Sequence, residues 1–170
     1  MQTTLITEIG QTMDELIKTF SLFAHEQIDT VPFDGSWTAG EVAEHIIKSI
    51  VSLPQLFAHN LEQTIDRTYD ANVPAIRKMF LDFTTKMQSP GFILPQQKHH
   101  DKEAILKSFD ELKTQTINTA ASVDLTLTCK MAEFPGFGYL TTLEWLNFAI
   151  VHTQRHTNQL KNIYEALQKK

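Results

Sequence analysis

Apolar residues recur at helical spacing in four stretches, and this periodicity constrains the fold more than any other feature of the chain. Residues three or four apart share one face of an α-helix, so each stretch predicts an amphipathic helix. The first two faces carry Leu5, Ile9, Met13, Leu16, Phe20 and Phe23, and then Val42, Ile46, Ile50, Leu53 and Phe57. The other two carry Ile105, Phe109, Leu112 and Thr116, and then Trp145, Phe148, Ala149, His152, His156, Leu160 and Ile163. No comparable period-two alternation is found, so we predict an all-α fold that forms one domain over residues 1–170.

Two of these helices have well-marked starts. Thr38 followed by Glu41, and Thr141 followed by Glu144, form capping boxes that satisfy backbone donors of the first turn. The third helix is expected to begin after Asp101 as its N-cap. Well-anchored helices hold the side chains of their following turns in a fixed register.

Proline and glycine interrupt the pattern elsewhere. Pro54 should kink or shorten the second helix. A long connection then runs from about residue 66 to residue 100, in which Pro74 can open a short helix through Ile76, Phe80 and Phe83. After the break at Pro90 the chain is expected to be extended through residues 92–95, and a second break at residues 135–138 introduces the last helix.

The last helix contains His152 and His156, whose spacing of four places both rings on one face with Cβ atoms roughly 5–6 Å apart. They continue the inner stripe that Trp145 begins, and burying two imidazoles without partners is unfavourable. His45 lies on the inward side of the second helix. If the two helices are neighbours, the three histidines form a metal site with open coordination positions.

The other four histidines need no special explanation. His25, His59, His99 and His100 fall near helix ends or in the connection, where we expect solvated rings. Gln159 lies one turn after His156, either as a hydrogen-bond partner that orients an imidazole or as a solvated polar residue.

Composition excludes several classes of function. The net charge is −5 and the basic residues are scattered, which argues against a nucleic-acid partner. Cys129 is the only cysteine, so no internal disulfide is possible, and we expect it to be a small buried residue rather than a nucleophile. No signal segment and no membrane span is found, so we expect a cytoplasmic protein without a membrane partner.

Two stretches resemble the DinB/YfiT-like superfamily. Residues 37–45, Trp-Thr-Ala-Gly-Glu-Val-Ala-Glu-His, resemble its tryptophan-containing helix start and first ligand. Residues 135–160, with Pro135-Gly136-Phe137-Gly138 and the His152–His156 pair, resemble its closing segment. The resemblance implies an up-down-down-up four-helix bundle, a metal held by His45, His152 and His156, and often a homodimer.

The resemblance also suggests activities. Our first interpretation is a metal-dependent hydrolase whose divalent ion, with zinc or nickel favoured, activates water for a small-molecule substrate. The first alternative is a transferase that uses a low-molecular-weight thiol as cofactor, for which Lys48 and Arg155 are the nearest cations in the sequence. The second is a non-enzymatic metal- or ligand-binding stress protein. The sequence names no catalytic base, because Glu41 and Glu144 are better explained as caps.

Overall fold

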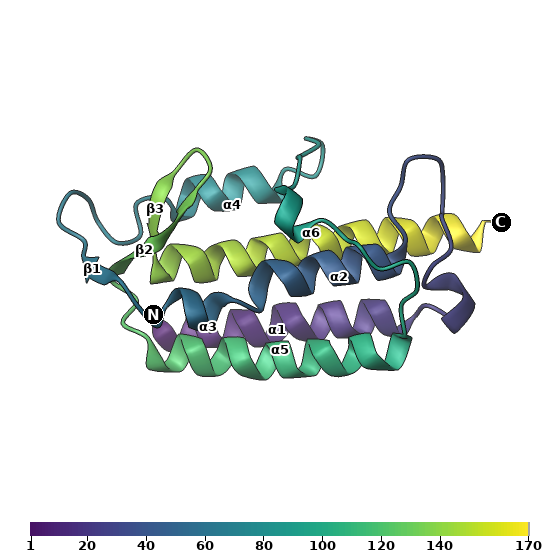
Figure 1. Cartoon of the computed structure of the whole chain (residues 1–170), viewed down its shortest axis with the longest axis horizontal. Helices are drawn as coiled ribbons and strands as arrows, with labels where there is room; N and C mark the ends of the chain where they lie inside the picture. The colour runs from purple at the N-terminus through teal and green to yellow at the C-terminus, as the bar shows by residue number, and fades with distance from the viewer. Residues whose placement is uncertain (170) are drawn as a thin grey trace.

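Four long helices pack side by side in the computed structural model, in which residues 1–169 are described (Figure 1). Helix α1 packs against α5 and α6, and α2 packs against the same two helices. The four therefore form a ring in which α1 and α2 occupy opposite corners. Their bounds are Gln2–Ser21 for α1, Ala39–Ile50 for α2, Lys102–Ser122 for α5 and Thr142–Gln168 for α6.

Prolines shape the shorter helices as the sequence predicts. Helix α2 ends at Ile50, and the short helix α3 restarts with Pro54 in its first turn. Pro74 likewise lies in the first turn of α4, which packs along α6. Proline suits the first turn because its missing N–H would have no helical partner there. The remaining bounds are Leu53–Leu56 for α3, Val73–Leu81 for α4, and His25–Gln27 and Gly91–Ile93 for the 3-10 turns η1 and η2.

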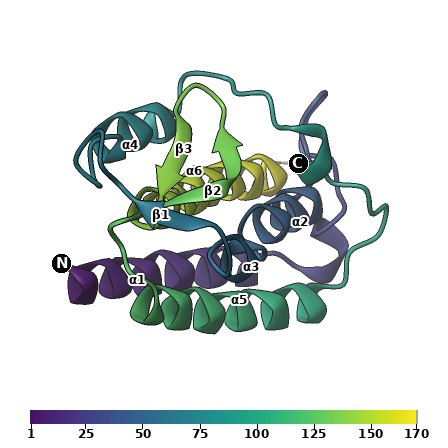
Figure 2. The same ribbon diagram turned by 60° about the vertical axis from the view of Figure 1, so that its left-hand side comes forward.

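A small antiparallel sheet corrects the all-α prediction. Its strands are β1 (Leu61–Gln63), β2 (Leu127–Phe134) and β3 (Gly138–Thr141), paired in that order, and Figure 2 shows the β2–β3 hairpin lying against α6. The sequence offers one signal for this hairpin. Leucine and threonine alternate over residues 125–128, and a turn sequence, Pro135-Gly136, follows them. Gly136 has φ +82°, which favours glycine.

A second correction concerns the chain after Pro90. Residues 91–93 form the 3-10 turn η2, and extended backbone begins only at Leu94. The carbonyl groups of Ile93 and Leu94 accept hydrogen bonds from two side chains of α2, His45 and Lys48. Contacts of this kind, which depend on a distant helix, are not visible in the local sequence.

Both predicted capping boxes are confirmed. Thr38 Oγ1 accepts from the Glu41 amide at 3.2 Å, and the Thr38 amide donates to Glu41 Oε2 at 2.8 Å. Thr141 and Glu144 repeat the arrangement, with corresponding distances of 3.2 and 2.9 Å. The two helices that carry the three site histidines are therefore anchored at their starts.

Glu144 also takes part in a buried ion pair. Its side chain is 0% exposed and accepts hydrogen bonds from both terminal nitrogens of Arg67, at 2.6 and 2.8 Å, and from the Asn72 amide at 2.8 Å. Arg67 further donates to the Tyr139 carbonyl at 3.1 Å. This pair ties the chain between β1 and α4 to the start of α6.

Cys129 is buried in strand β2. Its thiol donates to the Leu56 carbonyl at 3.1 Å, and burial raises its pKa. A thiol with a raised pKa is a poor nucleophile at neutral pH, so the sequence-based interpretation of a structural cysteine stands.

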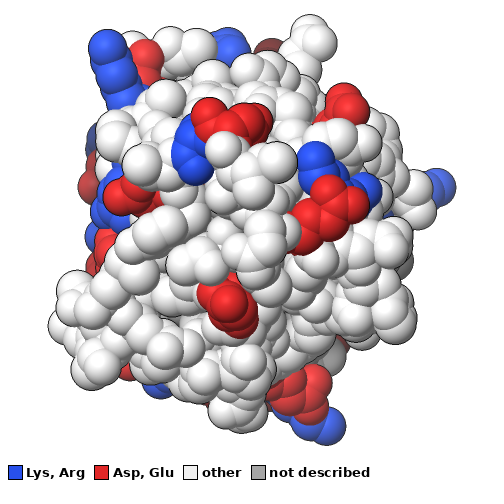
Figure 3. Space-filling model, turned by 90° about the vertical axis from the view of Figure 1, so that its left-hand side faces the viewer, with Lys and Arg blue, Asp and Glu red and all other residues white. Residues whose placement is uncertain are grey.

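The surface carries charges of both signs. On the face shown in Figure 3, Lys and Arg side chains lie beside Asp and Glu side chains, and large uncharged areas separate them. No helix within residues 1–169 is both long and apolar enough to cross a membrane.

We predict that Arg67→Met lowers the free energy of unfolding by about 3 kcal/mol, because it leaves the buried Glu144 carboxylate without its counter-charge. Urea denaturation would measure this. The control is Lys107→Met, which breaks the exposed pair with Glu111 and should cost less than about 0.5 kcal/mol. Equal losses in the two variants would contradict the structural role assigned to Arg67.

Candidate metal centre

The contact between α2 and α6 brings together His45, His152 and His156. Among the described residues, they form the one set of three or more ligating side chains whose donor atoms all lie within 4.8 Å of one another. The Nε2 atoms of His45 and His152 are 3.1 Å apart, and the rings of His152 and His156 have centroids 4.5 Å apart. The sequence analysis expected the three histidines to meet if their two helices were neighbours, and the structure has this arrangement.

All three rings are buried inside the bundle. His45 is 1% exposed, His152 is 4% and His156 is 9%. Each lies within a buried apolar stripe of its helix, which includes Val42 and Ile46 on α2 and Leu160 on α6. The hydrophobic packing of these neighbours decides which sides of the two helices face each other. The imidazoles lie on the same sides and are therefore buried with them.

Hydrogen bonds fix two of the rings. His45 Nδ1–H donates to the Ile93 carbonyl at 2.9 Å, and His156 Nδ1–H donates to Gln159 Oε1 at 2.7 Å. A proton on Nδ1 leaves a lone pair on Nε2, which is the nitrogen then available to a metal. The sequence left two roles open for Gln159, and in the structure it is the hydrogen-bond partner that orients His156.

His152 differs from the other two. Its Nε2 faces His45 Nε2, while its Nδ1 is a buried atom without a hydrogen-bond partner among the described residues. A buried polar atom without a partner is costly and calls for an explanation. An ion bound at Nε2 would hold the ring in the cluster, and the proton would then lie on Nδ1, still without a partner within residues 1–169.

Burial keeps the cluster neutral. It lowers the pKa of His156 to about 4, with charge repulsion from His45 and Arg155 adding to the shift and the hydrogen bond that His156 donates to Gln159 opposing it. Burial also lowers the pKa of His45, and it holds the pKa of His152 well below its ordinary value. Metal ions bind the neutral form of imidazole, so the three rings are in the required state at neutral pH.

The Nε2 atoms of His45 and His152 are close enough to share one divalent ion. Two nitrogens that each lie about 2.0–2.1 Å from zinc can be no more than about 4.2 Å apart. The separation of 3.1 Å between His45 Nε2 and His152 Nε2 satisfies this limit. Three imidazoles leave at least one coordination position for another ligand, as in catalytic zinc sites.

Aromatic side chains surround the cluster. The ring centroids of Trp37 and His45 are 5.2 Å apart. The ring centroids of Phe80 and Phe148 lie 6.0 and 5.0 Å from that of His152. Together with Ile93 they cover the histidines. The site in this structure is therefore closed and largely apolar at its walls.

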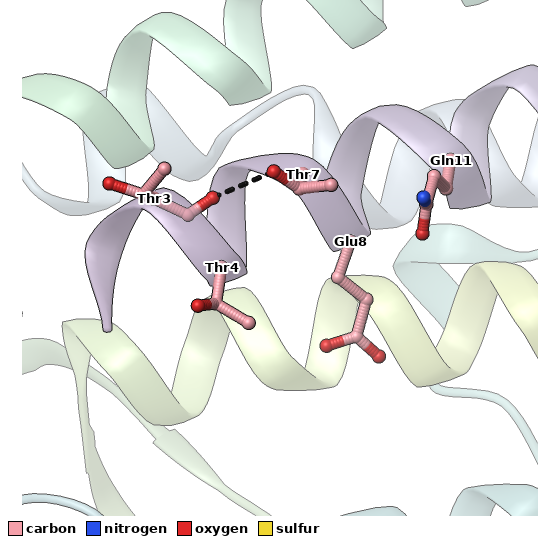
Figure 4. Close-up of a pocket in the computed structure, with 5 residues that line it drawn as sticks. All are labelled: Thr3, Thr4, Thr7, Glu8 and Gln11. Carbon is pink, nitrogen blue, oxygen red and sulfur yellow. Dashed lines mark hydrogen bonds between the residues drawn. The ribbon is translucent and has the colours of Figure 1, made fainter.

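A surface hollow lies elsewhere, on α1 (Figure 4). Its five lining residues all belong to that helix, and its one ionisable group, Glu8, is paired with Arg77 at 2.6 Å. None of the three site histidines lines it. Its other lining residues are Thr3, Thr4, Thr7 and Gln11.

The two cations nearest the site in sequence are held in other contacts. Lys48 donates to the Leu94 carbonyl at 3.0 Å and pairs with Glu44 at 2.6 Å. Arg155 donates to the Phe80 and Asp82 carbonyls at 3.2 and 2.7 Å, and also to the Thr85 carbonyl. Both therefore hold the connecting chain in place.

Sequence reasoning missed two contributors near the site. The Ile93 carbonyl that orients His45 has no sequence signature. His100, expected to be solvated, has a side chain only 2% exposed and lies between Asp29 and Glu44. Its burial requires acidic partners from elsewhere in the chain, which the sequence around it does not reveal.

The family assignment follows from the sequence profile of the DinB superfamily, which matches residues 8–160. The chain belongs to the DinB superfamily. It is 22% identical over 148 residues to the uncharacterized protein YuaE of Bacillus subtilis (strain 168), a match that covers 85% of this chain and 87% of that protein. The similarity thus extends over most of both sequences.

The fold is similar to that of YfiT from Bacillus subtilis, with a TM-score of 0.64 over 98% of this chain and 87% of that chain. YfiT is described as a probable metal-dependent hydrolase with an unusual four-helix bundle topology. The sequence identity is 14%, so this likeness supports the fold of the present DinB chain.

We predict that the metal-free protein loses stability as the pH falls below 6.5. The unfolded histidines take up protons near pH 6.5, whereas the folded His156 does so only near pH 4, so acid favours unfolding. The stabilisation is complete above pH 6.5, and His156 alone accounts for a loss on the order of 2 kcal/mol by pH 5.

Urea denaturation at several pH values would measure this dependence. His156→Gln should reduce the slope between pH 6.5 and 5, whereas His25→Gln, which changes an exposed ring, should not. A slope unaffected by His156→Gln would mean that this ring is not buried in its neutral form.

Proposed function

We propose that this protein is a metal-dependent hydrolase in which His45, His152 and His156 hold one divalent ion, with zinc or nickel favoured. The observation that carries the proposal is the convergence of three neutral, buried imidazoles, two of which are oriented by hydrogen bonds at Nδ1. When bound, such an ion acts as a Lewis acid and lowers the pKa of a coordinated water towards neutrality. The description of YfiT supports the same class of reaction.

The protein's own residues bind and orient the ion and exclude water. The aromatic side chains Trp37, Phe80 and Phe148 make the surroundings apolar, which strengthens electrostatic interactions at the site. Glu41 and Glu144 are engaged in capping boxes, so we assign neither as a general base.

Burial of the histidines favours a second candidate, a metal-binding protein without turnover. A substrate can reach the ion only if part of the cover moves, and a permanently closed site would hold a structural ion. The thiol-dependent transferase remains a third proposal. Lys48 and Arg155, which would be expected to bind the carboxylates of a thiol cofactor, are held by backbone carbonyls instead.

The up-down-down-up order of the helices also belongs to the proposal. Its support is the colour gradient in Figure 1, in which α1 and α6 run from left to right and α2 and α5 run from right to left. A single domain over residues 1–170, a small-molecule substrate, a cytoplasmic location and a homodimer complete the proposal. These rest on the sequence patterns and on the family resemblance.

We predict that protein purified without an affinity tag carries up to one divalent ion per chain, which chelation removes. His152→Ala, His156→Ala and His45→Ala should each abolish most of the binding, because two imidazoles hold an ion far less well than three. Elemental analysis would measure the content. His59→Ala, at an exposed histidine outside the cluster, is the matched control and should retain the ion.

Full metal occupancy in a His152→Ala/His156→Ala double variant would refute the site.

Substitution of the ion by cobalt should separate the three functional candidates. Hydrolysis requires an exchangeable water, so we expect added imidazole to change the cobalt absorption bands. Bands that stay unchanged in millimolar thiol would argue against the transferase and leave the hydrolase as the favoured enzyme. A spectrum insensitive to both ligands would identify a closed structural site and refute the two enzymatic proposals.

A further inference from the structure

A largely buried polar cluster, in which one carboxylate is 31% exposed, adjoins the metal site on the side of α2. It consists of Asp29, Glu44 and His100, and we call it the clamp. Its members come from three separate parts of the chain: the segment after η1, helix α2, and the last residues before α5. In Figure 1 the teal chain that follows η2 runs along α2 before it turns towards α5. The clamp fastens this segment, residues 93–100, to the helix.

Glu44 makes the largest number of contacts between the clamp and the segment that it fastens. It is 7% exposed, and its carboxylate accepts hydrogen bonds from the Gln96 and Gln97 amides at 3.0–3.1 Å. It also lies 3.2 Å from His100 Nε2. Bonds from backbone donors to a carboxylate are charge-assisted and strong, so they fix the position of the segment as well as its sequence register.

His100 connects Glu44 to Asp29. Its Nδ1 lies 2.6 Å from Asp29 Oδ1, and its backbone amide donates to Asp29 Oδ2 at 2.9 Å. The ring packs directly on Gly40 of α2, where an added Cβ would lie only 2.4 Å from His100 Nδ1. Glycine at position 40 is therefore what allows the ring to reach both carboxylates.

The fastened segment reaches the site through its other end. The Ile93 carbonyl accepts the Nδ1–H of His45, and the Leu94 carbonyl accepts a hydrogen bond from Lys48. His45 follows Glu44 in the sequence, so successive residues of α2 bind the same segment from neighbouring faces. The position of the Ile93 carbonyl decides which nitrogen of His45 carries the proton.

We propose that Asp29, Glu44 and His100 are positioning residues for the metal site: by fastening residues 93–100 to α2, they hold the Ile93 carbonyl where it fixes the tautomer and orientation of His45. This inference rests on the proposed function for its metal-binding consequence. The effect on the tautomer is independent of any ion. None of the three residues belongs to the histidine cluster itself.

The test uses two variants of the full chain, each with a matched control. His100→Ala removes the link between the carboxylates, and His99→Ala changes the neighbouring exposed histidine. Gly40→Ala adds one methyl group that displaces the His100 ring. Gly10→Ala adds the same group to α1, where the nearest atom would be 3.9 Å away. Alanine favours helix over glycine at both positions, so a loss in Gly40→Ala alone points to the clamp.

The first readout is the imidazole nitrogen NMR spectrum of the metal-free protein. We expect His45 to be protonated at Nδ1 in the unmodified protein and in both controls. In His100→Ala and Gly40→Ala we expect a mixture of tautomers and at least tenfold faster hydrogen exchange at the Gln96 and Gln97 amides. The second readout is zinc affinity by chelator competition, which should fall about tenfold or more in these variants and stay unchanged in the controls.

An unchanged His45 tautomer together with zinc affinity within about twofold of the unmodified protein would overturn the inference, even if stability fell. The two proposals can fail separately. If the unmodified protein binds no zinc, the proposed function fails. The tautomer and exchange measurements would still decide whether the clamp positions His45.

Discussion

The packing of α2 against α6 is the constraint on which the rest of the structure depends. It brings His45 to His152 and His156, and it is set by apolar side chains such as Val42, Ile46 and Leu160 that have no part in metal chemistry. Hydrophobic packing is non-directional, so by itself it fixes which faces meet but not the orientation of a polar ring. That orientation comes from hydrogen bonds, to the Ile93 carbonyl and to Gln159.

Two kinds of interaction hold the buried histidine cluster: hydrophobic packing places the rings, and hydrogen bonds orient them. Burial makes the imidazoles neutral and lowers their pKa, which favours a metal and disfavours protons. The same burial covers the site with aromatic rings. The burial that favours metal binding therefore hinders the access of a substrate to the ion. A hydrolase built this way needs part of its cover to open, whereas a structural site does not.

The connecting segments contribute more than links between helices. Arg67 reaches from the chain after β1 to the buried Glu144, and Arg155 on α6 holds the carbonyl groups that follow α4. The segment 93–100 is fastened by Glu44 and His100. In each case a charged side chain binds backbone or carboxylate groups of a segment distant in the sequence. The connections are therefore held in one arrangement beside the site.

The sequence by itself determined the helices, their starts at Thr38 and Thr141, and the three histidines, because helical periodicity and capping act over a few residues. Strand β1 was missed because its partners are far away in the chain, as Cys129 is from Leu61, whereas the local β2–β3 hairpin had only a short leucine–threonine alternation as its signal. Only the tertiary structure decided that His100 is buried and that Ile93 orients His45, since both depend on partners from distant segments. Short-range periodicity cannot encode those partners, so the three histidines were predictable and the residues that orient them were not.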